Sequence, residues 1–309
     1  MTESDYEIRN YRLGYFNQYF QFRLETERMD QAGAQISRAR LEEELNRPNF
    51  QPGKNLFLAE IDGRIVGAAG IFPELPIGRV VLEVIVRPDF RRQGLAKRLV
   101  STVLDRSAEL GTVRVQGEAA EVNLAAQGLL KGLGFKPVRP HLEMVLDLTA
   151  AVLPDNDVEI VCRPLESGQE RKLTRLQNRS FSGSWGFNPN TTAEVVYDLD
   201  QEGCSFEDAI LAWRGGRLCG YCWLKIAPAV NALQVKSQGR VQMLGVDPDH
   251  RNRGIGLAVL IAGLARLKEK GIGQAILTVD GRNRAALSLY RSAGFEARSR
   301  IIWYEKRLS

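Results

Sequence analysis

The chain has 309 residues, 44% hydrophobic and 26% charged, which is ordinary globular composition with enough apolar residues for two cores. Its formal net charge of +5 comes from 42 basic and 37 acidic residues without a basic run, which argues against a nucleic-acid partner and suits an anionic cofactor. Four cysteines, a polar N-terminus and no stretch of eighteen apolar residues predict a cytoplasmic protein with reduced thiols and no membrane segment.

The first half of the chain contains a regular succession of predicted elements. A strand and one or two helices come first, and a hairpin follows at residues 57–67, where β-favouring residues flank the turn pair Asp62-Gly63. A longer strand at 80–86 leads through a turn into a helix, a strand, a second helix and a last strand that ends near Leu148. Residues 154–157 are typical of a linker.

The second half repeats the first at a nearly constant offset. Residues 86–94 (VRPDFRRQG) coincide with 246–254 (VDPDHRNRG) at Val, Pro, Asp, Arg and Gly, an offset of 160. The same offset carries Asn123 onto Asn283, and a match extended over this length is hard to obtain by chance. One unit is therefore used twice.

The hairpin of the first copy matches residues 210–220 at the smaller offset of 153, so we expect a seven-residue insertion between Gly220 and Val246. Each copy has the element order of an α+β fold with a mixed α/β sheet. We therefore predict two tandem domains, an N-terminal one at 1–150 and a C-terminal one at 157–309.

A turn in each copy has the composition of a diphosphate-binding site. The backbone N–H groups at the start of the following helix lack intrahelical partners, glycine allows close approach of phosphate oxygens, and arginines add charge-assisted hydrogen bonds. The alternative is an ordinary turn with solvated arginines, but its occurrence in both copies favours binding. The two turns are Arg91-Arg92-Gln93-Gly94-Leu95-Ala96 and Arg251-Asn252-Arg253-Gly254-Ile255-Gly256.

These residues resemble the GCN5-related N-acetyltransferase (GNAT) superfamily. The resemblance rests on residues 246–256, on Asn283 to Tyr290 and on Gly294-Phe295, and it covers the later two-thirds of each half. The duplication is similar to that of mycothiol synthases, which also carry two such domains in one chain. It implies two tandem acyl-CoA N-acyltransferase folds that use acetyl-CoA as the acetyl donor and need no metal.

The resemblance also implies where acetyl-CoA binds. The cofactor would lie where two central strands splay, with its diphosphate on the turns and its pantetheine arm along the strand edge. In the C-terminal copy the arm would contact Leu244, Gly245, Val246 and Asn283. In the N-terminal copy the matching residues are Val84, Ile85, Val86 and Asn123.

Tyr290 is the expected catalytic acid, by its match to the family's tyrosine, because a departing thiolate gains from a proton donor. The alternative is a core aromatic on an amphipathic helix. The matching residue of the N-terminal copy is Leu130, which cannot donate a proton, so that copy is expected to be degenerate, although Glu83 remains there as a possible base. Mycothiol synthases carry a glutamate where Arg240 stands here, which argues against that substrate.

The base of the C-terminal copy stays open between Glu207, Asp208, Asp280 and a water-mediated route. The loop at 178–187 follows the first helix of that copy, and its aromatic residues either stack on the acceptor or fill a domain interface.

The expected function is acetyl transfer to a primary amine of a small molecule, an aminoacyl compound or a peptide N-terminus. The alternatives are a non-catalytic acyl-CoA-binding protein and a mycothiol synthase. We expect a monomer or homodimer without nucleic-acid or membrane partners. Cys219 and Cys222 should point to opposite faces of a strand and bind no metal.

Overall fold

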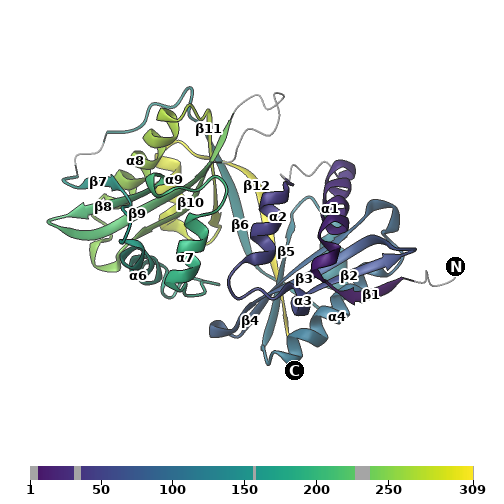
Figure 1. Ribbon diagram of the computed structural model, residues 1–309. Helices are drawn as coiled ribbons and strands as arrows, with labels where there is room; N and C mark the ends of the chain where they lie inside the picture. The colour runs from purple at the N-terminus through teal and green to yellow at the C-terminus, as the bar shows by residue number, and fades with distance from the viewer. Residues whose placement is uncertain (1–5, 31–35, 156–157, 227–236, 309) are drawn as a thin grey trace. The chain divides into compact units, whose positions relative to one another are not determined.

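The computed structural model describes the chain except for residues 1–5, 31–35, 156–157, 227–236 and 309. The chain forms two compact units, which comprise residues 1–139 with 301–309 and residues 140–300. We refer to them as unit 1 and unit 2. Both carry the mixed sheet with flanking helices that the sequence predicted, and Figure 1 gives the order of their elements.

The sheet of unit 1 has the strand order β1-β2-β3-β4-β5-β12, with β4 and β5 parallel and the other neighbours antiparallel. Its strands are β1 (Glu7–Asn10), β2 (Leu56–Ile61), β3 (Arg64–Glu74), β4 (Arg79–Val86), β5 (Arg114–Ala120) and β12 (Glu296–Arg307). Its helices are α1 (Phe16–Asp30), α2 (Arg38–Asn46), α3 (Pro52–Asn55), α4 (Leu95–Glu109) and α5 (Leu124–Gly132).

The sheet of unit 2 has the strand order β6-β11-β10-β9-β8-β7, with β10 and β11 as its parallel pair. Its strands are β6 (Lys136–Asp147), β7 (Val161–Pro164), β8 (Ala209–Arg214), β9 (Arg217–Ile226), β10 (Gln238–Val246) and β11 (Gln274–Asp280). Its helices are α6 (Glu170–Phe181), α7 (Thr192–Leu199), α8 (Ile255–Glu269) and α9 (Arg284–Ser292).

The last strands of the two halves of the sequence are exchanged: β6 ends the first half but pairs in unit 2, and β12 ends the second half but pairs in unit 1. Residues 301–307 of β12 pair with β5, and residues 141–147 of β6 pair with β11. Figure 1 shows this as a yellow strand beside teal β5 and a teal strand beside green β11. The compact units therefore differ from the sequence ranges 1–150 and 157–309 by this exchange of strands.

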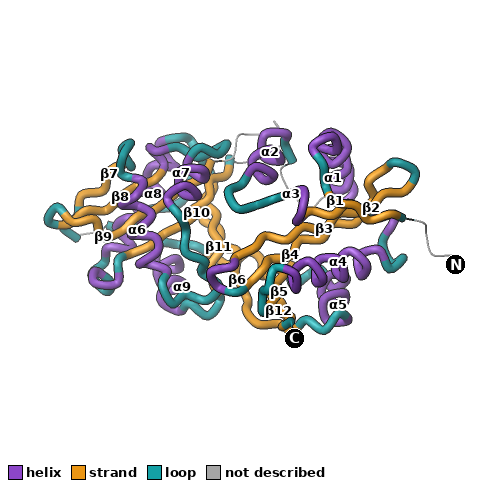
Figure 2. Tube along the Cα trace, turned by 60° about the horizontal axis from the view of Figure 1, so that its bottom comes forward, coloured by secondary structure: helices purple, strands orange, loops and turns teal. Residues whose placement is uncertain are grey.

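Each sheet buries both of its faces under helices. In unit 1, α1 and α2 pack on one face through Tyr19, Phe22 and Leu41, and α4 packs on the other through Leu99 and Val103. Figure 2 shows these two helix layers on opposite sides of the strands. In unit 2, α8 and α9 share a core cluster with one face, while α6 and α7 share a cluster with the other.

The predicted hairpins form as tight turns. Asp62 and Gly63 have φ of +49° and +73° between β2 and β3, and Gly215 and Gly216 have φ of +53° and +75° between β8 and β9. Two successive positive φ values match the twist of a two-residue hairpin, and they explain why Asp-Gly and Gly-Gly stand at these turns.

Strand β10 contains a bulge where the register against β9 shifts between Val241 and Met243, so Gln242 is an extra residue. By contrast, β4 pairs with β3 in continuous register from Arg79 to Val86. Gln242 accounts for one residue of the expected seven-residue insertion. The rest falls in the connection from β9 to β10, most of which lies outside the described residues.

Among the described residues, no helix is both long and apolar enough to cross a membrane.

Candidate functional site

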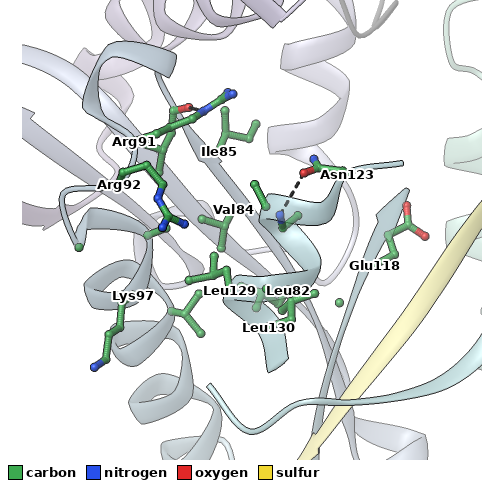
Figure 3. Close-up of a pocket in the computed structure, with 18 of the residues that line it drawn as sticks. Leu82, Val84, Ile85, Arg91, Arg92, Lys97, Glu118, Asn123, Leu129 and Leu130 are labelled. Carbon is green, nitrogen blue, oxygen red and sulfur yellow. Dashed lines mark hydrogen bonds between the residues drawn. The ribbon is translucent and has the colours of Figure 1, made fainter. Parts of the chain in front are cut away.

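A pocket of about 880 Å³ lies in unit 1 among β4, β5, α4 and α5 (Figure 3), a volume in the range of cofactor sites. It brings together most of the residues predicted for the N-terminal copy. Gln93 and Leu95 do not line it, because the Gln93 side chain donates to the Asp89 carbonyl and Leu95 is buried in the core. The predicted residues that line it are Val84, Ile85, Val86, Arg91, Arg92, Gly94, Ala96 and Asn123.

The pocket exists because two parallel strands diverge. Leu82 and Gly117 are the last residues paired between β4 and β5, although both strands continue beyond them. Residues 84–86 of β4 therefore face open space instead of a neighbouring strand on that side. In unit 2 the pairing of β10 with β11 ends in the same way, at Arg240 and Ile276. Both copies have the predicted splay.

The start of α4 offers free backbone donors to an anion. Gly94 is the N-cap residue in the left-handed region (φ +84°), where no side chain caps the helix, and Arg92 also has a positive φ of +63°. A turn of this kind gathers successive N–H groups into an anion-binding concavity, to which the helix dipole adds positive charge. A Cβ at Gly94 would contact nothing within 4 Å, so the backbone conformation, not crowding, requires glycine.

The C-terminal copy repeats this turn. Gly254 caps α8 with φ +74°, again without a side-chain cap, and Asn252 has φ +58°. A Cβ at Gly256 would lie 3.6 Å from Val246 and 3.5 Å from Leu289, so the start of α8, the end of β10 and α9 converge here.

The first arginine of each turn stabilises the turn itself through hydrogen bonds to the backbone. Arg91 Nε donates to the Val86 carbonyl at 2.9 Å, and Arg251 Nε donates to the Val246 carbonyl at 3.3 Å. Arg251 Nη2 also donates to the Ser180 carbonyl at 2.6 Å, which ties the turn to α6. The backbone amides, with exposed Arg92 and Arg253, are therefore the groups best placed to meet a phosphate.

Asn123 and Asn283 are helix N-caps. Their Oδ1 atoms accept from the backbone N–H of Ala126 at 3.0 Å and of Ala286 at 3.1 Å, as the dashed line in Figure 3 shows for Asn123. The cap uses the acceptor side of each amide and leaves the Nδ2 donors for a ligand.

Tyr290 lies on α9, with 7% of its surface exposed and its ring against Phe295 at a centroid distance of 5.9 Å. Burial raises the pKa of its phenol well above the ordinary value, because the phenolate loses hydration there. The hydroxyl therefore stays protonated at neutral pH, which is the state that an acid requires.

Sequence reasoning missed a second phenol near this place. The ring of Tyr221 on β9 lies over Gly245, so closely that a Cβ on Gly245 would be 2.6 Å from Tyr221 Cε1 and 3.0 Å from Ser180 Oγ. The hydroxyls of Tyr221 and Ser180 are both buried without a hydrogen-bond partner among the described residues. The signal was a glycine at a strand position where the N-terminal copy has Ile85.

The face of unit 2 that carries Arg240 is occupied by an ion cluster. Arg240 contacts Glu143 Oε2 at 3.4 Å and donates to Thr278 Oγ1 at 3.1 Å, while Arg298 binds Glu143 Oε1 at 2.7 Å. Both carboxylate oxygens of Glu143 are therefore engaged by arginines.

Two of the open base candidates lie at the far end of α8. Asp208 binds Lys270 at 2.6 Å, and Glu207 binds Arg266 at 2.5 Å. These partners stand at the C-terminal end of a 15-residue helix, about 22 Å along its axis from the Gly254 turn. Asp280 accepts the Arg282 backbone N–H and so shapes a turn.

The N-terminal copy has two carboxylates, Glu83 and Glu118, in the region that matches the Arg240–Glu143–Arg298 ion cluster of unit 2. Glu118 lines the pocket with an exposed side chain. The pKa of the half-exposed Glu83 is raised, because partial desolvation and the nearby carboxylates of Glu44 and Glu118 outweigh Arg23, whose Nη2 lies 4.0 Å away.

The aromatic loop of the C-terminal copy is internally packed. Phe181 and Phe187 stack at a centroid distance of 5.4 Å, and Trp185 makes an edge contact of 5.8 Å with His141. Phe181 and Phe187 thus pack on each other, and Trp185 packs on β6.

Both thiols of the Cys219-x-x-Cys222 motif are fully buried in the same core cluster, so the prediction of opposite faces was wrong. Cys219 is an extra residue in β9, where the register against β8 shifts, and the bulge turns both thiols inward. Burial raises the pKa of Cys222 to about 12. Within the described residues, no group of three His, Cys, Asp or Glu side chains is placed to hold a metal ion.

Comparison with known proteins agrees with this geometry. The acetyltransferase (GNAT) family model matches the chain twice, at residues 18–135 and 171–295. The mycothiol acetyltransferase of Acidothermus cellulolyticus is 32% identical over 270 residues, which cover 81% of this chain and 79% of that protein. The mycothiol acetyltransferase of Thermobispora bispora is 32% identical over 265 residues, with 82% and 85% coverage.

Solved structures show the same fold over the whole chain. A GCN5-related N-acetyltransferase from Sphaerobacter thermophilus superposes with a TM-score of 0.76 at 22% identity, covering 99% of this chain and 97% of that one. A tandem GNAT protein from the clavulanic acid biosynthesis pathway gives a TM-score of 0.73 at 14% identity, covering 98% of each.

The chain therefore belongs to the acetyltransferase (GNAT) family and carries two copies of the family's fold in tandem. Together with its relatives, this makes it an N-acetyltransferase.

Proposed function

We propose that the C-terminal copy transfers the acetyl group of acetyl-CoA to a primary amine, with Tyr290 as the acid. The observation that carries this proposal is the coincidence, in one copy, of the Gly254 turn, the splay beyond Arg240 and a protonated phenol on α9. Leu130 replaces the phenol in the other copy, so we assign the N-terminal copy to binding without turnover.

Different residues of the C-terminal copy bind different parts of acetyl-CoA. The amides at the start of α8 bind the diphosphate, the edge of β10 at residues 244–246 aligns the pantetheine arm, and the Asn283 amide donates from the other side. Acetyl-CoA supplies the thioester. Tyr290 gives its proton to the departing sulfur, while water accepts the proton that the attacking amine loses.

The acceptor is a small molecule, an aminoacyl compound or a peptide N-terminus. A cysteinyl amine on a sugar conjugate is the second candidate, because the relatives from both Acidothermus cellulolyticus and Thermobispora bispora are mycothiol acetyltransferases. Arg240 and Arg298 both contact Glu143 on the sheet face to which we assign the acceptor, so two cations outnumber one anion there. Such a face favours an acceptor with an acidic or strongly polar group beside its amine.

A pair of matched variants tests the assignment of the two copies. Gly254→Glu and Gly94→Glu each place a carboxylate, in a strained conformation, at a proposed diphosphate site. We expect Gly254→Glu to abolish turnover of acetyl-CoA with an amine panel that includes a cysteinyl sugar conjugate, and Gly94→Glu to retain it. The reverse pattern would move catalysis to the N-terminal copy. Two unaffected proteins would remove both turns from the function.

A further inference from the structure

The floor of the N-terminal pocket differs from the matching place in the C-terminal copy. In unit 1 the strands part at Leu82 and Gly117, and both residues line the pocket. Gly117 corresponds to Leu277, and Leu82, once the bulge in β10 is counted, corresponds to Val241. Val241 and Leu277 are 4% and 1% exposed within the core of unit 2. Leu277 therefore places a side chain in the C-terminal copy at the position where Gly117 leaves none in the N-terminal copy.

Two further positions follow the same trend. Val100 and Leu130 line the pocket, and their counterparts in unit 2 are the larger residues Leu260 and Tyr290. Figure 3 shows Leu130 and Leu82 at the apolar end of the pocket, away from Arg91 and Arg92. At this end of the pocket, Gly117, Val100 and Leu130 are smaller than their counterparts, while Leu82 is larger than Val241.

Backbone geometry does not account for Gly117. It is absent from the described glycines with positive φ, and a Cβ there would lie 3.4 Å from the Leu82 carbonyl oxygen, which is ordinary contact. A side chain is therefore sterically possible at residue 117, as Leu277 shows at the matching place. The glycine leaves apolar volume inside the pocket.

The other end of the pocket is basic. Arg92 and Lys97 line it, where the C-terminal copy has Asn252 and Leu257. The C-terminal copy has an arginine of its own, Arg253, where the N-terminal copy has Gln93. A ligand with several negative charges at one end and an apolar chain at the other fits this division.

We propose that the N-terminal copy binds a CoA thioester whose acyl chain is longer than acetyl, such as butyryl or hexanoyl, with the chain over Gly117. This inference rests on the proposed CoA site of that copy and adds its acyl specificity. Leu130 offers no proton to the sulfur, so the thioester is held as a ligand and is not consumed.

Calorimetry on the full-length Gly254→Glu protein tests the proposal, because that variant leaves only the N-terminal site open. The probes are acetyl-CoA, butyryl-CoA and hexanoyl-CoA. Two more buried methylenes correspond to roughly 15-fold tighter binding of butyryl-CoA, at about 0.8 kcal/mol each. Adding Gly117→Leu should abolish this preference while acetyl-CoA still binds. Thermal unfolding of each variant checks its fold.

The outcomes separate two failures. Equal Kd values for acetyl-CoA and butyryl-CoA in the Gly254→Glu protein would overturn the acyl specificity and keep the CoA site. No heat with any thioester, while the Gly94→Glu protein binds acetyl-CoA, would overturn the N-terminal CoA site itself. The Gly94→Glu protein also serves if Gly254→Glu fails to fold, since the proposal requires that the preference for butyryl-CoA be lost in it.

Discussion

The two copies share a backbone plan but distribute side-chain bulk differently around the splayed strands. In the C-terminal copy, Tyr221 lies over Gly245; at the paired positions of the N-terminal copy, Ala68 faces Ile85. Large and small residues have changed places across the same strand pair. Tyr221 and Tyr290 lie buried near the splayed strands of the C-terminal copy, whereas the N-terminal copy has an open pocket of about 880 Å³ at the matching place. The function proposed above assigns catalysis to the C-terminal copy and ligand binding to the N-terminal copy.

The largest expected effect concerns Tyr290. Tyr290→Phe should lower kcat on the order of 10- to 1000-fold, because the leaving thiolate loses its proton donor, while acetyl-CoA binding changes little. Tyr304→Phe is the control, since it removes a phenol bonded to Gln127 in unit 1 and should leave kcat unchanged. Steady-state rates across pH measure both. Equal rates in wild type and Tyr290→Phe would remove this phenol from the mechanism.

Substitution of the paired residues Gly245 and Tyr221 should have a smaller effect, which falls on the free energy of unfolding. Gly245→Ile forces a side chain against Tyr221 and Ser180 and should cost about 1–3 kcal/mol of unfolding free energy. The double variant Gly245→Ile with Tyr221→Ala copies the Ile85–Ala68 pair, so its cost should be lower than the sum of the single costs by about 0.5–3 kcal/mol. Urea denaturation gives the values. Strict additivity would show that the two sites do not share this space.

The smallest effect is expected at alkaline pH. Burial raises the pKa of Tyr221 well above its ordinary value, so the folded state favours the neutral phenol. The stability this contributes is complete below about pH 10, the ordinary pKa of an unfolded tyrosine, and declines as the pH rises above it. Tyr221→Phe should therefore unfold at higher pH and, without a buried unpartnered hydroxyl, gain about 1 kcal/mol or less at neutral pH.

Unfolding by pH jump, with Tyr15→Phe as a control at a partly exposed phenol bonded to Glu60, measures this effect. If the two variants gave the same alkaline midpoint, the burial of Tyr221 would have no bearing on alkaline stability.

Much of the fold was readable from the sequence, because the repeat at an offset of 160 doubled every local signal. Gly94 and Gly254 pointed to the same helix start, and the Asp-Gly pair at 62–63 and the Gly-Gly pair at 215–216 marked the hairpins that the structure contains. These features depend on a few neighbouring residues, so pattern alone identifies them.

The sequence did not predict the features that depend on packing between distant segments. Period-2 patterns predict that β6 and β12 are strands, but they carry no information on which neighbour each strand pairs with. The bulge at Gln242 has no glycine or proline to mark it, and the inward turn of Arg251 depends on a carbonyl of α6. The Tyr221–Gly245 contact and the volume above Gly117 likewise arise only when β9, β10 or β5 meet their neighbours.

The exchange of last strands has a consequence for the order of folding. Residues of unit 2 run without interruption from 140 to 300, whereas unit 1 waits for residues 301–309. The bond between Gln116 and Glu305, 2.7 Å long, spans 189 residues of chain, so closing this sheet carries a large loop entropy. During synthesis, the first copy to be made is therefore the last to be completed, and its unpaired β5 edge needs protection until the C-terminus arrives.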